Sequence, residues 1–441
     1  MSAGRLAQLS PANRHHAEQA LARASEALKA ASGVEPSGRL WVPGRIEVLG
    51  KHTDYAGGRS LTCAVERGFA VAFTPRSTAE VRIIDAHDRR HAQFALADNL
   101  TPPVGEWINY PMTVARRLAR NFPGLATGAD IAFYSNLPRA AGLSTSSALI
   151  TAVYLALTSV NDLPGRRAFQ EALPSDVSVA GYLGSIENGQ AFGTLAGDSG
   201  VGTFGGSEDH TAILLSQAGV LGSYHYRPVT RLRQIALDPD LIFVVASSGI
   251  VADKTGGARE DYNRASNLVR ALLALWQQAT GRADATLADA LASAPDAAEQ
   301  MRRLASASAH GDFSPVQLRN RLEHFITEDG QVIPAALEAL AAGDLDQFGR
   351  LVDRSQEAST TLLGNQVPET IALARLAREH GALAASAFGA GFGGSVWALT
   401  HFEEAEGFGH AWKVAYAKAH PGPARHSTFF LSRPGPGAGA A

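Results

Sequence analysis

The chain has 441 residues, of which 45% are hydrophobic and 18% are charged, and its formal net charge is −3 at pH 7. This composition predicts a globular protein of two or three domains and excludes a disordered chain. The sequence has no block of basic residues, so nucleic acid and anionic membranes are not expected as partners.

A single cysteine, Cys63, excludes an intramolecular disulfide and is typical of a protein from a reducing compartment. The first residues lack the basic segment and the apolar run of a signal peptide. No apolar run reaches the roughly 20 residues that a helix needs to cross a bilayer. We therefore expect a cytoplasmic protein.

A long helix is expected near the start of the chain, over residues 11–32. Ser10 can cap this helix, Pro11 suits its first turn, and Gly33 can end it. Strands and helices then mix without a steady βαβ rhythm, which favours an α+β fold over a doubly wound parallel sheet. From the spacing of apolar residues and from turn residues we expect, in chain order, strands at 39–42 and 61–75, a helix at 106–122, a strand at 130–138, a helix at 148–157, a strand at 241–249, helices at 259–281 and 334–356, and two strands of small residues within 382–400.

The stretch "VPGRIEVLGKHTDYAGG", residues 42–58, is close to a nucleotide-binding P-loop. A P-loop has a glycine, four spacers and then Gly-Lys-Ser/Thr. Arg45 stands where the first glycine would be, and His52 stands where the magnesium-binding hydroxyl would be. The stretch is therefore not a P-loop.

The stretch "GAGFGG", residues 389–394, matches the dinucleotide-binding pattern GxGxxG. In that pattern the last glycine opens a helix. Here a β-type segment, "SVWALT", follows instead. We therefore reject dinucleotide binding, and a tight hairpin turn remains the alternative.

A third loop lies between these two, in "LPRAAGLSTSSALITAV", residues 137–153, which passes from a strand through small residues into a helix. Free N–H groups at a helix start attract anions, and small residues let a phosphate approach the backbone. The hydroxyls of Ser144, Thr145, Ser146 and Ser147 are candidate ligands of a phosphate or of Mg²⁺. The alternative is that these residues only cap the helix.

In this order the three loops resemble those of the GHMP kinase superfamily, and the first resembles its galactokinase branch. "PGRIEVLGKHTDYAGG" is similar to the branch motif P-G-R-x-N-L-I-G-E-H-T-D-Y-N-x-G, "PRAAGLSTS" to P-x-x-x-G-L-S-S-S, and "GAGFGG" to G-x-G-F-G-G. Smaller agreements at 107–110, 343–356 and 367–369 extend the similarity over residues 42–399. Three ordered motifs are far more specific than any one of them.

The resemblance implies a two-lobed α+β fold with the active site in the cleft between the lobes. We expect an N-terminal lobe with the sugar motif and the phosphate loop over residues 1–235, a C-terminal lobe over 236–432, and a flexible tail over 433–441. The resemblance also implies ATP-dependent transfer of phosphate to the anomeric hydroxyl of a hexose, with Mg²⁺ as cofactor. The expected partners are therefore a small sugar and ATP, and the expected assembly is a monomer or a weak homodimer.

By the same resemblance, Arg45 matches a catalytic arginine that spans phosphate and sugar, and His52 and Asp54 match residues that hold sugar hydroxyls. A carboxylate suits that task because it accepts two hydroxyl hydrogen bonds at once. Tyr262 matches a tyrosine that contacts the sugar, and Gly206 is assigned to the sugar as well. The residues assigned to ATP are Trp107, Gly142, Leu143, Ser144, Thr145, Ser146, Ser147 and Gly391.

The catalytic carboxylate comes from a further family motif, C-G-x-M-D-Q, which "GGSEDH" matches best. The match makes Asp209 the residue that takes or orients the proton of the anomeric hydroxyl. Ser146 and Glu187 are the expected ligands of Mg²⁺, which prefers hard oxygen donors. The gap between Glu187 and Asp209 is longer than in the family, so the chain has an insertion there. Glu208 and Asp198 therefore remain rival metal ligands.

Two residues of the first loop depart from the family pattern. The family's asparagine is Glu47 here, and the family's glutamate, which lies near the C6 hydroxyl of the sugar, is Lys51. Lys51 is assigned to the substrate, where it would meet a negative group such as the C6 carboxylate of a hexuronate. The alternative is that Lys51 pairs with Glu47. Both interpretations stay open, with a slight preference for a neutral hexose because the other sugar-binding residues are retained.

The leading hypothesis is a galactokinase-like sugar 1-kinase that acts on a hexose. One alternative is a hexuronate 1-kinase of the galacturonate type, and another is a catalytically silent sensor of sugar and ATP on the same scaffold. Arg45 and Asp209 are both present, which argues against the silent sensor. Without the motif, these two residues would be read as an ordinary buried ion pair.

Overall fold

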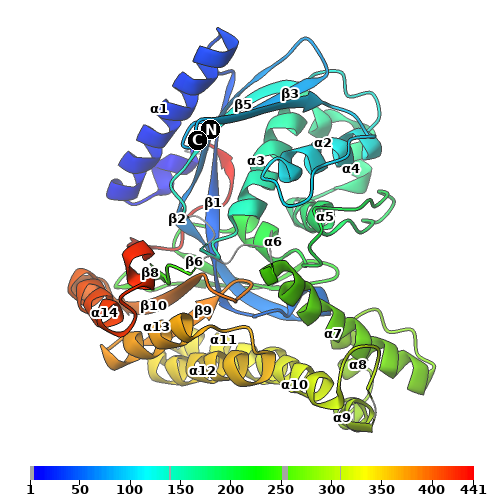
Figure 1. The fold of residues 1–441 in the computed structure, drawn as a ribbon, viewed down its shortest axis with the longest axis vertical. Coiled ribbons are helices and arrows are strands. Elements are labelled where there is room, and N and C mark those ends of the chain that lie inside the picture. The colour runs from blue at the N-terminus through cyan, green and yellow to red at the C-terminus, as the bar shows by residue number, and fades with distance from the viewer. Residues whose placement is uncertain (1–3, 139–140, 251–256, 308) are drawn as a thin grey trace.

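The computed structural model of the chain describes residues 4–138, 141–250, 257–307 and 309–441. Within these residues two β-sheets organise the molecule, and helices pack on both of them (Figure 1). The sheet in the upper half of the figure has eight strands and the lower one has four. The architecture is mixed α+β, as predicted.

The larger sheet runs in the order β12-β1-β2-β5-β3-β4, and β6 and β7 extend it from β2. Neighbouring strands are antiparallel except β3 and β5, which are parallel. Its strands are β1 (Gly38–Leu49), β2 (Arg59–Pro75), β3 (Glu80–Asp85), β4 (Arg90–Ala95), β5 (Ala129–Ser135), β6 (Val220–His225), β7 (Thr230–Ala236) and β12 (Gly439–Ala440).

The central strand β2 is buried on both faces because helices cover each of them. Small side chains such as Ala70 and Ala72 pack toward α1, in line with the alternation of side chains along a strand. Larger side chains such as Val71 and Phe73 belong instead to the main core, which α3 shares. The helices of this half are α1 (Pro11–Ser32), α2 (Asn109–Asn121), α3 (Thr145–Val160), α4 (Arg167–Ala172), α5 (Asp176–Asn188) and α6 (Glu208–Leu215).

The smaller sheet runs in the order β11-β8-β10-β9, and all its pairs are antiparallel. Its strands are β8 (Leu241–Ser247), β9 (Ala384–Phe388), β10 (Ser395–His401) and β11 (Phe429–Ser432). The helices of this half are α7 (Gly257–Thr280), α8 (Leu287–Ala292), α9 (Ala297–Ala307), α10 (Pro315–Phe325), α11 (Ile333–Ala342), α12 (Leu345–Ala358), α13 (Pro368–Glu379) and α14 (Ala405–Ala419). None of the described helices is long and apolar enough to cross a membrane.

Most of the expected elements are present, but the helix expected at 334–356 is two helices. Gly343 separates α11 from α12 and adopts a left-handed φ of 71°, which ends α11. The expected strand at 39–42 is only the first part of the longer β1. The expectation lacks helices α4 to α6, α8 to α10, α13 and α14 and strands β3, β4, β6, β7, β11 and β12.

Residues 433–441 do not form a flexible tail, so that prediction is wrong. Gly435 forms a β-bridge with Ala64, and β12 pairs with β1. The glycines serve this close packing, since a Cβ on Gly437 would lie 2.4 Å from the carbonyl oxygen of Leu214. The end of the chain therefore returns to the larger sheet.

The chain changes from the larger to the smaller sheet close to the expected lobe boundary at residue 235. β7 ends at Ala236 and β8 begins at Leu241. Because β12 lies in the larger sheet, the second half of the chain is not confined to one lobe. The division into lobes at this residue stays a prediction.

Candidate active site

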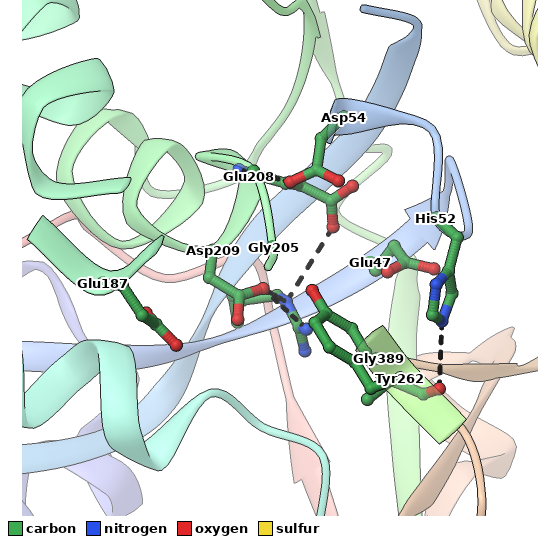
Figure 2. Close-up of a pocket in the computed structure, with 12 residues that line it drawn as sticks. Glu47, His52, Asp54, Glu187, Gly205, Glu208, Asp209, Tyr262 and Gly389 are labelled. Atoms are coloured by element: carbon green, nitrogen blue, oxygen red, sulfur yellow. Dashed lines mark hydrogen bonds and ion pairs between the residues drawn. The ribbon is translucent and has the colours of Figure 1, made fainter. Parts of the chain in front are cut away.

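A polar pocket lies at the junction of β1, α5, α6, α7 and the loop between β9 and β10 (Figure 2). Five of the residues that line it carry carboxyl groups, and one carries a permanent positive charge. The lining residues are Arg45, Glu47, His52, Asp54, Glu187, Gly205, Gly206, Glu208, Asp209, Tyr262, Gly389 and Ala390.

Arg45 on β1 and Asp209 in the first turn of α6 are paired in this pocket. The arginine Nε lies 2.8 Å from Oδ1 of Asp209, and one terminal nitrogen lies 2.7 Å from the same oxygen. Another terminal nitrogen donates to the carbonyl of Gly142 at 2.5 Å. The side chain of Arg45 is 4% exposed and that of Asp209 is 20% exposed. The guanidinium is therefore held in place while the carboxylate keeps an open side.

The small-residue loop lies directly against Arg45. The backbone N–H of Arg45 donates to the carbonyl of Leu143 at 3.3 Å, and Ser144 adopts a left-handed φ of 59° where α3 begins. This loop also touches the glycine turn, because a Cβ on Gly389 would lie 2.8 Å from the carbonyl oxygen of Gly142. The second and third loops of the sequence therefore meet at one place.

Two further residues assigned to ATP, Gly391 and Trp107, lie in different surroundings. Gly391 packs so tightly on Asn365 that a Cβ would lie 2.3 Å from its carbonyl oxygen. Trp107 does not line the pocket, and its ring instead faces the Arg90 guanidinium at 5.0 Å. Residues 139–140 of the small-residue loop lie outside the described residues.

Glu187, near the end of α5, lies beside the pair of Arg45 and Asp209. The hydroxyl of Ser147 donates to Oε2 of Glu187 at 2.9 Å and to Oδ2 of Asp209 at 3.3 Å. His210 also donates from Nε2 to Oε2 of Glu187, at 2.9 Å, so this nitrogen carries the proton. Ser147, not Ser146, is thus the hydroxyl that contacts Glu187, and the metal role of Ser146 stays a prediction.

The donor set around Glu187 suits Mg²⁺, which prefers hard oxygen ligands and usually binds one or two protein carboxylates together with substrate phosphates. Glu187 supplies a carboxylate, and the start of α3 supplies hydroxyls. The described residues hold no group of three or more His, Cys, Asp and Glu placed to bind a metal by themselves. Phosphate oxygens would therefore have to complete the coordination.

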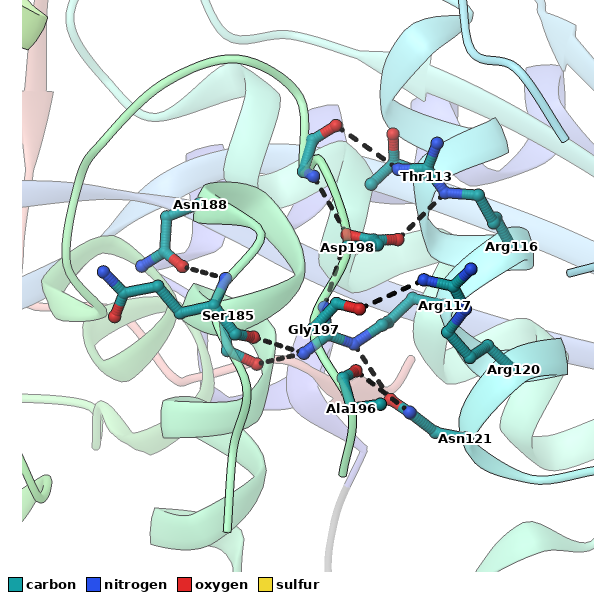
Figure 3. Close-up of polar contacts among 12 residues, drawn as sticks. Thr113, Arg116, Arg117, Arg120, Asn121, Ser185, Asn188, Ala196, Gly197 and Asp198 are labelled. Carbon is teal, nitrogen blue, oxygen red and sulfur yellow. Dashed lines mark hydrogen bonds and ion pairs between the residues drawn. The ribbon is translucent and has the colours of Figure 1, made fainter. Parts of the chain in front are cut away.

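The insertion before Asp209 packs against α2, and this removes Asp198 from the site (Figure 3). Oδ2 of Asp198 accepts a hydrogen bond from Nε of Arg116 at 2.9 Å, and Oδ1 lies 3.3 Å from a terminal nitrogen of Arg117. The backbone N–H of Gly200 donates to the same Oδ1 at 2.9 Å. Asp198 therefore anchors the insertion, and Glu187 is the carboxylate that lies beside Asp209.

His52 and Tyr262 form one wall of the pocket. Nε2 of His52 lies 3.0 Å from the carbonyl oxygen of Ala390, so Nε2 carries the proton, and Nδ1 accepts a hydrogen bond from the hydroxyl of Tyr55 at 2.8 Å. The rings of His52 and Tyr262 lie 5.2 Å apart. Burial, together with nearby carboxylates, raises the pKa of Tyr262 well above its ordinary value. Its hydroxyl is therefore a permanent hydrogen-bond donor.

Asp54 lies on the neighbouring wall, fixed by backbone groups. It accepts hydrogen bonds from the N–H of Tyr55 at 2.8 Å and from the N–H of Glu208 at 3.2 Å. A Cβ on Gly206 would lie 2.3 Å from Oδ2 of Asp54, so only glycine fits beside this carboxylate. The structure thus brings together the predicted sugar-binding residues of the first loop, the catalytic motif and α7.

Lys51 is the predicted substrate residue that does not line the pocket. It is fully buried, and its Nζ donates to the hydroxyl of Ser355 on α12 at 2.8 Å. Its backbone N–H lies 3.4 Å from Oε1 of Glu328. Among the described residues, no ion pair joins Lys51 to Glu47. The hydrogen bond of the Lys51 ammonium is thus with α12, although its charge also acts on Glu47, and the role of Lys51 toward the substrate stays a prediction.

A pair of buried carboxylic acids lines the pocket: Glu47, the possible partner of Lys51, and Glu208, a rival metal ligand on sequence grounds. Each residue is 4% exposed, and within the part of the chain that the structure describes Oε1 of each has no hydrogen-bond partner. The nearest cation to Glu208 is Arg45, whose Nε lies 4.0 Å from Oε1. Burial raises the pKa of Glu47 to about 7, although the charges of Arg45 and Lys51 act to lower it. Burial and the charges of Glu47 and Asp54 raise the pKa of Glu208 well above 4.5.

Three family descriptions match the chain in order along its length. "Galactokinase galactose-binding signature" matches residues 29–75, "GHMP kinases N terminal domain" matches 109–186, and "GHMP kinases C terminal" matches 336–418. The chain belongs to the GHMP kinase superfamily, in its galactokinase branch. The pocket described above is therefore the candidate active site of a galactokinase-like sugar kinase.

Curated relatives of this galactokinase-like chain are similar over nearly their whole length. A galactokinase of Roseiflexus sp. is 28% identical, and the match covers 92% of this chain and 94% of that protein. A galactokinase of Chloroflexus aggregans is also 28% identical, over 87% of this chain and 89% of its own.

Solved structures share the fold. The crystal structure of Lactococcus lactis galactokinase complexed with galactose matches with a TM-score of 0.78 and 20% identity, over 96% of this chain and all of that one. The crystal structure of Methanococcus jannaschii mevalonate kinase matches with a TM-score of 0.53 and 13% identity, over 90% of this chain and 98% of its own. The predicted GHMP kinase fold is confirmed.

Proposed function

We propose that this galactokinase-like enzyme transfers the γ-phosphate of ATP to the anomeric hydroxyl of a neutral hexose. The observation that carries the proposal is the pair of Arg45 and Asp209, whose carboxylate opens into a pocket with polar walls. The anion-binding start of α3 lies next to this pair, joined to it by Ser147. A phosphate donor and a hydroxyl acceptor can therefore both reach Asp209.

Phosphoryl transfer depends on positioning and on neutralising charge more than on covalent chemistry. Asp209 takes or orients the proton of the accepting hydroxyl, and Arg45 fixes that carboxylate while stabilising negative charge on the transferred group. Backbone N–H groups at the start of α3 bind phosphate oxygens. Glu187 and the hydroxyls of that helix start would hold Mg²⁺, which supplies further positive charge to the phosphates.

The neutral hexose is favoured over a hexuronate by the charges around the pocket. A sugar carboxylate would approach Asp54 and the buried acids Glu47 and Glu208, whose raised pKa values mean that negative charge is already disfavoured there, while the ammonium of Lys51 is directed to Ser355. Placing like charges together in a buried site is unfavourable. The silent sensor is disfavoured because the two residues that a kinase needs for the transfer, Arg45 and Asp209, are present and in contact.

A coupled assay of ADP release over a panel of sugars tests the proposal. We expect turnover with galactose or another neutral hexose, with kcat/KM at least about tenfold above galacturonate, because a charged group without a partner costs about 1–3 kcal/mol. Lys51→Met should leave the ratio of the two kcat/KM values unchanged in the protein that folds, because the ammonium of Lys51 bonds Ser355. Faster turnover of galacturonate would contradict the neutral hexose. Absence of sugar-dependent ADP release with any sugar would favour the sensor.

A second prediction concerns the hydroxyls at the start of α3. We expect Ser146→Ala to raise the KM for Mg·ATP by about five- to a hundredfold and to change the KM for the sugar little, since one ligand contact is lost on the nucleotide side. Ser147→Ala is the matched variant, and it should lower kcat instead, because Ser147 bonds both Glu187 and Asp209. Equal effects of Ser146→Ala on both KM values would remove Ser146 from the metal site.

A further inference from the structure

A second cavity lies on the other side of the Gly205–Gly206 segment from the active site. It has a volume of about 190 Å³, against about 30 Å³ for the pocket beside Asp209. Its walls come from α5, α7, the segment that leads into α6, and the turn between β6 and β7. The residues assigned to sugar, ATP and metal do not use it, apart from Gly206.

Two arginines reach this cavity from different parts of the fold. Arg227 comes from the turn between β6 and β7 of the larger sheet, and Arg270 comes from α7. Burial is the largest cause that lowers the pKa of Arg227, and the charge of Arg270 is the next, so the two guanidinium groups lie within electrostatic reach of each other. The charges of Asp54 and Asp289 oppose this effect more weakly.

Neither arginine has a carboxylate within 4.0 Å in the part of the chain that the structure describes. Arg227 donates one hydrogen bond to the carbonyl of Tyr55 at 3.3 Å, and Arg270 donates one to the side chain of Asn267 at 3.3 Å. Each guanidinium has five N–H donors, so most of this donor capacity is available. Two adjacent cations of this kind favour an anion between them.

The surroundings indicate what the anion is attached to. The guanidinium of Arg270 lies over the ring of Phe204 at 4.6 Å, and Phe192 also lines the cavity. Gly184 of α5 lets this helix pack against Ser207, since a Cβ on it would lie 2.6 Å from the Cβ of Ser207. A guanidinium binds phosphate with two parallel hydrogen bonds, and aromatic rings suit the ring of a sugar or a base.

We propose that this cavity is a second ligand site, which binds the phosphate group of a small phosphorylated metabolite between Arg227 and Arg270. The site is separate from the transfer of phosphate to the sugar and does not depend on which sugar is the substrate. Its position links it to the active site, since Gly205 and Gly206 line both cavities. Asn188, which lines the second cavity, also donates a hydrogen bond from its side-chain amide to the carbonyl of Gly205 at 2.8 Å.

The test is a calorimetric titration of the full-length protein with galactose, Mg²⁺ and a non-hydrolysable ATP analogue held at saturation, so that the active site is filled. Three probes are titrated separately: inorganic phosphate, galactose 1-phosphate and ADP. We expect at least one of them to bind with a stoichiometry of one. Binding of inorganic phosphate alone would assign the site to the free ion, and tighter binding of galactose 1-phosphate or of ADP would assign it to that compound.

Single variants then locate the binding. Arg227→Gln and Arg270→Gln should each weaken it by about ten- to a hundredfold, the loss expected for charge-assisted hydrogen bonds. Arg264→Gln, on the exposed part of α7 and over Phe313, is the matched control and should change nothing. Arg270→Lys keeps the positive charge, so it should retain part of the affinity that Arg270→Gln loses. Its partial binding would show that the loss in Arg270→Gln is not a general effect on folding. Failure of all three probes to bind, or equal binding to the Arg227→Gln/Arg270→Gln protein, would overturn the proposal.

Discussion

Asp209→Asn will lower kcat by about two to four orders of magnitude and leave the affinity for ATP nearly unchanged, as is typical for loss of a positioned base. An amide has nearly the same shape, but it accepts a proton poorly and carries no charge to pair with Arg45. The nucleotide contacts come from the start of α3 and do not include this carboxylate in the proposed arrangement. Single-turnover measurements with saturating ATP and sugar isolate the chemical step.

The substitution also leaves Arg45 buried without its main counter-ion, so folding must be measured beside activity. Arg45 keeps its bond to the carbonyl of Gly142, and Glu208 lies 4.0 Å away, which limits the loss of stability. Asp346→Asn, on the exposed start of α12, is the matched control and should retain full activity. A folded Asp209→Asn protein with near wild-type kcat would remove Asp209 from catalysis, and Glu208 would be the next residue to test.

The parts of the fold and site that could be predicted from the sequence are those with local signals. The helix of residues 11–32 starts at Pro11, and Gly33 ends it in the left-handed conformation, although the Ser10 hydroxyl bonds Glu66 and does not cap the helix. The loops around Arg45 and Ser144 each occupy one short motif, and the structure places them in contact. Asp209 follows from its motif as well, although the insertion before it lengthens the spacing.

The features that escaped prediction depend on contacts between segments far apart in the sequence. The direction of Lys51 is set by Ser355, about three hundred residues later in the chain, and no local pattern connects the two. The glycine-rich end of the chain has the composition of a flexible tail, yet its glycines allow close packing against β1 and α6. Glu47 departs visibly from the family motif. That Glu208 is its neighbour in space, however, becomes clear only once α6 is placed beside β1.

The pair of Glu47 and Glu208 leads to the last prediction, which concerns stability and pH. The pKa of Glu47 is about 7 in the folded protein, against an ordinary value of 4.5. Between these values the folded state binds a proton that the unfolded state does not bind. The free energy of unfolding therefore falls as the pH rises through this window, by up to about 1.4 kcal/mol per pH unit. Below about 4.5 this contribution is constant, and above about 7 the loss is complete.

Glu47→Gln should remove this dependence, because a glutamine has the shape of the protonated acid and does not titrate. We expect the variant to unfold at a higher urea concentration than the wild type at pH 8, and to differ little from it at pH 5. Removing the charge of Glu47 also relieves Glu208, whose pKa it helps to raise, so the variant should titrate with fewer protons overall.

Glu357→Gln, on the same protein but away from this pair, is the control for a general effect of charge. A Glu47→Gln protein that is less stable than the wild type at pH 8 would mean that folding stabilises the ionised form of Glu47, so that its pKa is not raised. The carboxylate would then act through the charges of Arg45 and Lys51, and the walls of the sugar pocket would carry one more negative charge at neutral pH.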